Sequence, residues 1–160
     1  MSLTSIVADL DRAGIRFVLI GGLAGIVHGS PRMTNDVDVC YDRARENLER
    51  LAALLASWDA RPVNFPEDLP WCMDAQTLRM SSILTLQTRR GFIDVFAEVP
   101  GVGDFAACDA IAETFEIGGR DVRVLGLRGL IASKRVADRT LDRADIVTYR
   151  KILELRGEKP

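Results

Sequence analysis

The 160-residue sequence contains few of the residues that mark several common protein classes. Its three cysteines, Cys40, Cys72 and Cys108, form no CxxC pair, which argues against a zinc knuckle or a disulfide framework. No apolar run is long enough to span a bilayer, and we expect no signal peptide because acidic residues interrupt the apolar pattern of the N-terminus. These features favour a protein of the reducing cytoplasm that does not enter a membrane.

An excess of positive charge is also lacking. The 21 Lys and Arg residues and the 23 Asp and Glu residues give a formal net charge of −2. No global basic field therefore exists to hold a long nucleic acid by its phosphates, and a small or tethered substrate is the simpler interpretation. The apolar content of 48% and the charged content of 28% are ordinary for a soluble protein. The length fits one domain over residues 1–160.

Hydrophobic periodicity predicts a mixture of helices and short strands. Helices are predicted over 4–13, 21–28, 43–57, 127–138 and 142–155, and strands over 15–20, 37–41, 78–80, 83–87, 91–96, 114–117 and 122–125. Hairpin signals between strands predict an α+β fold, with a small mixed sheet of about five strands, helices packed on one face and two C-terminal helices. Prolines predict a long loop over 59–76, and 104–112 is predicted to be a short helical or irregular connection.

The strongest functional pattern begins at the first predicted strand. The apolar run Phe17–Ile20 leads into Gly21 and Gly22, and thirteen residues separate these glycines from Asp36-Val37-Asp38. Side chains alternate along a strand, so the two aspartates point to the same side of the sheet. Two neighbouring carboxylates repel each other, and a hard divalent cation such as Mg²⁺ would remove that repulsion.

This spacing resembles that of the nucleotidyltransferase superfamily of the DNA polymerase beta type. The local sequence is most similar to the small bacterial members, the minimal nucleotidyltransferases and the AbiEii-type toxins. The superfamily has a third carboxylate, flanked by apolar residues on a later strand, and Asp94 in Phe92–Phe96 matches it. The resemblance implies a nucleotidyltransferase-like fold.

The resemblance also implies an activity. The chain would be a magnesium-dependent enzyme that moves a nucleoside monophosphate from an NTP, such as ATP, to a hydroxyl group and releases pyrophosphate. Asp36, Asp38 and Asp94 would be catalytic and would bind two Mg²⁺ ions, with Mn²⁺ as a substitute. The acceptor stays open between a protein, a tRNA and a small molecule. A toxin–antitoxin setting follows from the same likeness, with a homodimer or an antitoxin-like partner chain.

A second function class is a non-catalytic binding or regulatory module with the same fold, acting in a complex. The short chain lacks an obvious acceptor-binding domain, which favours a partner chain or a dimer in either case. The presence of all three acids favours the enzyme. Asp94 itself has a structural alternative, an ion pair with Arg89 or Arg90.

Five further residues are predicted to bind the nucleotide. Gly21 and Gly22 permit close approach of backbone amides to phosphate. Ser30 and Arg32 lie just before the carboxylates, where the alternative is a solvated loop. Lys134 continues an apolar helix face, and a charge at such a position must be paired or functional.

The alternatives for Lys134 are the triphosphate and an ion pair with Asp94, Asp138 or Asp142. Asp142 and Asp145 are expected to pair with arginines and to hold the last two helices together. For His28 we favour a packing role over that of a general base, and for Trp71 we favour a loop anchor over stacking on a nucleobase.

Overall fold

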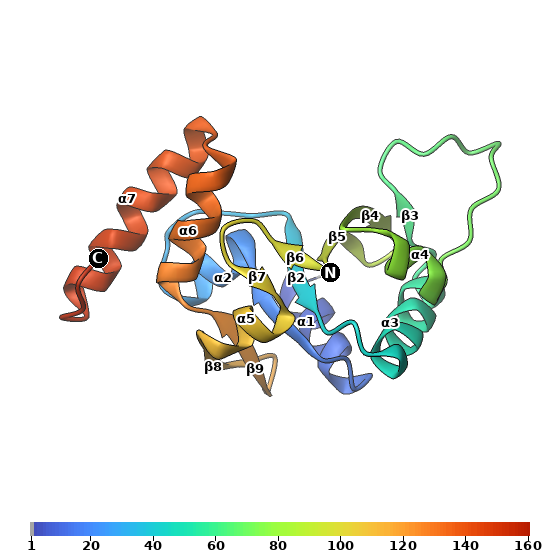
Figure 1. Cartoon of the computed structure of the whole chain (residues 1–160), viewed down its shortest axis with the longest axis horizontal. Coiled ribbons are helices and arrows are strands. Elements are labelled where there is room, and N and C mark those ends of the chain that lie inside the picture. Colours follow the sequence, from blue (N-terminus) through green and yellow to red (C-terminus); the bar gives the residue numbers. More distant parts are fainter. Residues whose placement is uncertain (1) are drawn as a thin grey trace.

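The computed structural model describes residues 2–160 and has a mixed α+β architecture (Figure 1). The helices are α1 (Leu3–Arg12), α2 (Gly21–Val27), α3 (Arg45–Ser57), α4 (Ala75–Met80), α5 (Phe105–Ala110), α6 (Leu127–Ala137) and α7 (Thr140–Leu155). The strands are β1 (Phe17–Ile20), β2 (Asp36–Tyr41), β3 (Arg61–Pro62), β4 (Ile83–Thr88), β5 (Gly91–Phe96), β6 (Glu98–Val99), β7 (Gly103–Asp104), β8 (Ala112–Ile117) and β9 (Arg120–Leu125). Within residues 2–160, the helices are too short or too polar to cross a membrane.

The main sheet has the strand order β3-β4-β5-β2-β1-β9-β8. Hairpins join β4 to β5 and β8 to β9, as the sequence predicts, whereas β2 pairs with β5 in parallel and with β1 in antiparallel fashion. The sheet is therefore mixed, with seven strands in place of the expected five or so. β1 is buried along its whole length, which places the core around the centre of the sheet.

The predicted strand over 78–80 is wrong, because these residues end the short helix α4. The Asp74 carboxylate accepts a hydrogen bond of 2.8 Å from the backbone N–H of Thr77 and so caps the first turn. Leu78 is fully buried within this helix. The apolar pattern of three residues did not distinguish a buried strand from one turn of helix.

The proline-rich loop projects from the body of the molecule between β3 and α4 (Figure 1). Trp71 anchors the second half of this loop, because its indole Nε1 donates a hydrogen bond of 2.7 Å to the carbonyl of Ala60. The Trp71 ring also contacts Phe65, at 5.3 Å between centroids. These contacts give Trp71 the anchoring role that the sequence favours.

The two C-terminal helices lie together at the opposite end of the molecule from α3 and α4 (Figure 1). His28 joins the end of α2 to the end of β9 and to the end of α7. Its Nε2 donates to the Leu125 carbonyl of β9 at 2.9 Å. Its Nδ1 accepts from Arg156 at 3.1 Å, so a neutral ring satisfies both contacts. Burial lowers the pKa of His28 and keeps the ring neutral. The packing role expected for His28 agrees with these contacts.

Candidate active site

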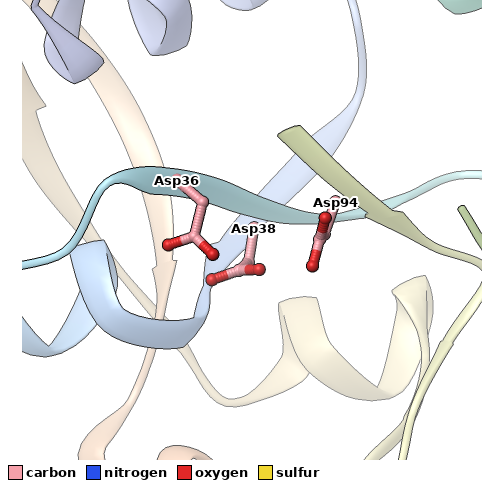
Figure 2. A group of neighbouring side chains, drawn as sticks. All are labelled: Asp36, Asp38 and Asp94. Atoms are coloured by element: carbon pink, nitrogen blue, oxygen red, sulfur yellow. The ribbon is translucent and has the colours of Figure 1, made fainter. Parts of the chain in front are cut away.

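Three carboxylates gather on one face of the sheet, from two adjacent strands. The parallel register of β2 and β5 sets Asp38 directly opposite Asp94, and Asp36 lies two residues before Asp38 on the same side. One oxygen from each of the three lies within 4.8 Å of the others. Figure 2 shows the side chains extending from β2 and β5 toward a common point. The sequence-predicted triad therefore meets in space.

The alternative ion pair of Asp94 with an arginine is not formed. Arg90 bonds to Asp9, and Arg89 lies 3.9 Å from Asp59, so both arginines are engaged elsewhere. Within residues 2–160, no ion pair involves any member of the triad. The three acidic side chains thus face one another with no basic side chain of residues 2–160 in ion-pair contact with them, although the more distant charge of Lys134 favours the charged form of Asp38.

Burial and mutual repulsion perturb the protonation of the triad. Burial, followed by the charges of Asp36 and Asp94, raises the pKa of Asp38 to about 7. Burial and the charge of Asp36 also raise the pKa of Asp94. Closely spaced carboxylate oxygens are the donors that a hard divalent cation such as Mg²⁺ prefers, so this donor set fits such an ion. A cation at this position would relieve the repulsion that raises both pKa values.

The two glycines allow the chain to turn against Asp38. Gly21 has φ = +66°, and a Cβ atom built there would lie 1.9 Å from Oδ2 of Asp38. The backbone amide of Gly22 favours the charged form of the same carboxylate, and a Cβ on Gly22 would lie 2.9 Å from the hydroxyl oxygen of Thr34. Thr34 in turn donates to Asp36. Only glycine at 21 leaves room for this carboxylate.

A cavity of about 360 Å³, here called the first cavity, opens in front of the triad. Every residue predicted for the site lines it except Ser30. The Ser30 side chain is instead buried in the preceding loop, where its oxygen accepts a long hydrogen bond of 3.4 Å from the backbone of Arg32. This geometry gives Ser30 a role in shaping the loop and offers no contact with the cavity.

Basic side chains line the wall opposite the triad, and acids of α7 hold them. Lys134 Nζ lies 3.0 Å from an oxygen of Asp142 and 2.8 Å from an oxygen of Asp145. Arg32 also bonds to Asp145, and Arg139 Nε lies 2.8 Å from Asp142. Lys134 therefore lines the cavity and is paired at the same time. Asp142 is one of its predicted partners, and Asp145 is an additional one.

The remaining predicted partners of Lys134 lie elsewhere. Asp138 bonds to Arg143, with 2.8 Å between Nε and the carboxylate, and Asp94 belongs to the triad. Asp142 and Asp145 are almost fully buried between α6 and α7. Both acids pair with arginines, as expected, Asp142 with Arg139 and Asp145 with Arg32. The ion pairs that join α6 to α7, however, are made by Lys134.

Sequence reasoning missed two polar residues at the site. Thr85 lies opposite Asp94 in the β4–β5 hairpin, and its side chain favours the charged form of that carboxylate. The hairpin turn between Thr88 and Gly91 fixes this register, so counting back from the turn would have found Thr85. Arg139 lines the first cavity at the start of α7. It forms a capping box with the aspartate three residues later, and this spacing in the sequence could have pointed to Arg139.

Comparisons with known proteins gave matches among solved structures alone: no protein-family model and no curated protein matches the chain. The lincosamide antibiotic adenylyltransferase LnuA, with lincomycin bound, is 16% identical with a TM-score of 0.62, over 94% of this chain and 95% of that chain. ANT(2″)-Ia in complex with adenylyl-2″-tobramycin is 16% identical with a TM-score of 0.59, over 92% and 85%. An antigenic nucleotidyltransferase-like protein from Paracoccidioides brasiliensis is 18% identical with a TM-score of 0.54, over 94% and 74%. The chain therefore has a nucleotidyltransferase-like fold, as its sequence predicts.

Proposed function

We propose that the chain is a magnesium-dependent nucleotidyltransferase. It would move a nucleoside monophosphate from an NTP to a hydroxyl acceptor and release pyrophosphate. The observation that carries the proposal is the triad of Asp36, Asp38 and Asp94, three unneutralised carboxylates within 4.8 Å beside a double-glycine turn. The fold shared with two antibiotic adenylyltransferases supports the same activity.

The triad would hold Mg²⁺, with Mn²⁺ as a substitute and two ions as the expected number. When bound, such ions neutralise charge on the triphosphate and make the acceptor hydroxyl more acidic. In the transfer, the acceptor oxygen bonds to the α-phosphorus while the bond from that phosphorus to pyrophosphate breaks. By the family resemblance, Asp94 is the carboxylate that would help to receive the hydroxyl proton.

The triphosphate would lie between the glycine turn and the wall that carries Lys134 and Arg139. Both basic side chains line the first cavity, and each is bonded to Asp142. Held by this acid, they present positive charge in a fixed place and need little reorganisation when the nucleotide binds. Arg32 lines the same cavity and would add a third positive charge.

The test is binding and transfer with each α-labelled NTP, with and without millimolar Mg²⁺. We expect saturable, Mg²⁺-dependent binding by the wild type and loss of both binding and transfer in the double variant Asp36→Asn plus Asp38→Asn. Asp59→Asn is the matched control, because this exposed carboxylate lies outside the first cavity and asparagine tolerates its left-handed backbone. Absence of NTP binding by the wild type would overturn the proposal and favour the non-catalytic module.

Several finer features stay predictions from the sequence. They are the AbiEii-like subtype, toxin activity, a homodimer or antitoxin-like partner, the use of ATP in particular, the single domain over 1–160 and the cytoplasmic location. Labelling of a lysate with each NTP would identify the preferred base, and a copurified partner chain would test the toxin–antitoxin setting.

A further inference from the structure

A second cavity, of about 420 Å³, adjoins the first one on the same face of the sheet. Asp36, Asp94, Arg32 and Thr34 line both cavities, whereas the double-glycine turn, Asp38 and Lys134 line the first alone. The carboxylates of Asp36 and Asp94 therefore lie where the two cavities meet. A group bound in the second cavity would reach these carboxylates from outside the phosphate-binding wall.

Large apolar side chains line the second cavity and remain partly exposed to solvent. Phe92 lies opposite Asp36 in the β2–β5 register and two residues before Asp94, so its ring lies on the same face as the acids. Its exposed fraction is 42%, and that of Met33 is 86%. Val63 lines the same cavity. Large apolar side chains left open beside a polar cluster are typical of a ligand site.

The two cavities differ more in the charge of their lining residues than in their volume. Arg32 is the sole basic residue among residues 2–160 that line the second cavity, and it is bonded to Asp145. The first cavity also has Lys134 and Arg139. The second cavity thus lacks the free positive charge that a phosphate-rich acceptor such as tRNA requires.

We propose that the second cavity is the acceptor site and that it takes a small hydroxyl compound with an apolar face and no negative charge. Phe92 and Met33 would cover the apolar face, and Asn35, which also lines the cavity, would hydrogen-bond the polar edge. The acceptor hydroxyl would meet the α-phosphate at the shared carboxylates. The volume lies in the range of small-molecule sites, about 300–1,000 Å³. This inference rests on the proposed function, because an acceptor site requires a transferase.

Methyl NMR of the full chain, with ¹³C at the methionine methyl groups, tests the assignment. Met33 lines the second cavity alone, and the variant Met33→Leu identifies its signal. The probes are lincomycin and a panel of neutral or cationic hydroxyl compounds with apolar rings, against total tRNA and tyrosine peptides. We expect compounds of the first group to shift the Met33 signal saturably and to become labelled by α-labelled NTP.

Phe92→Ala is the informative variant, and Ile83→Ala is its matched control. Ile83 is 44% exposed on the same face of the sheet, opposite Phe96 in the hairpin, and lines neither cavity. We expect Phe92→Ala to weaken acceptor binding, and to raise the acceptor KM, at least about tenfold. The KM for the NTP should not change in either variant.

Two failures can be distinguished by measuring Mg²⁺-dependent binding of each of the four NTPs on the same samples. Retained binding of an NTP, with no compound of the panel shifting Met33 or with tRNA or peptide labelled in its place, would overturn the acceptor assignment and leave the proposed function standing. An equal acceptor KM in Phe92→Ala and Ile83→Ala would also overturn it. Absence of binding of every NTP would overturn the proposed function, and the acceptor site with it.

Discussion

The two walls of the first cavity carry opposite arrangements of charge. On the sheet wall, Asp36, Asp38 and Asp94 face one another, and the pKa of Asp38 rises to about 7. On the helical wall, hydrogen bonds from Arg139 and Lys134 outweigh burial and lower the pKa of Asp142 to about 2. The charged form of an aspartate is thus disfavoured on one wall of the cavity and favoured on the other.

The contrast indicates that the helical wall stabilises the fold, whereas the sheet wall is suited to binding. The helical wall has a partner for each buried charge, so it holds α6 against α7 whatever the cavity contains. The sheet wall keeps like charges together, which costs folding free energy in the absence of a cation. A fold retains such a cluster against its own stability when the cluster binds something. We therefore expect substitutions on the two walls to change stability in opposite directions.

The largest expected effect is on the helical wall. Lys134→Met would leave the buried carboxylates of Asp142 and Asp145 without their shared cation and should lower the free energy of unfolding by about 3 kcal/mol. Thermal denaturation should show a fall of about 6–12 °C in the midpoint. Lys151→Met, at an exposed position of α7, is the control and should change little. Equal effects of the two variants would contradict a stabilising ion-pair network.

The next effect tests the glycine turn on the sheet wall. Gly21→Ala would place a Cβ atom 1.9 Å from Oδ2 of Asp38 and so push that carboxylate out of the triad. We expect transfer activity to fall about 100-fold, equivalent to about 2.7 kcal/mol in the barrier. Steady-state kinetics with saturating Mg²⁺ and NTP would measure the change.

Gly119→Ala provides the control for backbone strain. Gly119 has a similar left-handed conformation, with φ = +76°, but a Cβ atom there meets nothing within 4 Å. This variant should lose about 1 kcal/mol of stability and retain its activity. Comparable activity loss in both variants would mean that strain, and not the position of Asp38, limits the reaction.

Removing one charge of the triad should change the free energy of unfolding by less than Lys134→Met does, and should raise it. Asp38→Asn should raise the free energy of unfolding of the metal-free protein by about 2 kcal/mol at pH 8, because it removes a buried charge and relieves the repulsion from Asp36 and Asp94. Denaturant titration in EDTA would measure it. Addition of Mg²⁺ should then stabilise the wild type and leave the variant unchanged. A variant less stable than the wild type in EDTA would contradict uncompensated repulsion on the sheet wall.

Much of the sheet wall follows from local sequence. Alternation along one strand fixes the shared side of Asp36 and Asp38, and the apolar flanks of Asp94 place it on a buried strand. The hairpin turn after β4 fixes the register of β5 from within a few residues. Such short-range rules also give the double-glycine turn and the helix α3. These are the parts of the fold and site that the sequence predicts well.

The helical wall depends on contacts between distant residues, and prediction was weaker there. Nothing local shows that Arg32 bonds to Asp145, which is 113 positions away, or that Asp145 shares Lys134 with Asp142. These ion pairs depend on how distant segments meet in the fold. Two local features also differ from prediction: α4 forms at the end of a proline-rich segment, with Asp74 as its cap, and the Ser30 side chain turns into its own loop.

The smallest expected effect is the acid dependence of the helical wall. The folded-state pKa of Asp142, about 2, lies below its ordinary value of 3.8, so its contribution is present above about pH 4 and is lost as pH falls through 2. We expect Asp142→Asn to cost about 1–2 kcal/mol at pH 7, and the difference from the wild type to shrink as pH falls from about 4 to about 2. Urea titrations of both proteins at several pH values would measure it. A difference that stays constant down to pH 2 would show that the side-chain charge of Asp142 contributes nothing to stability.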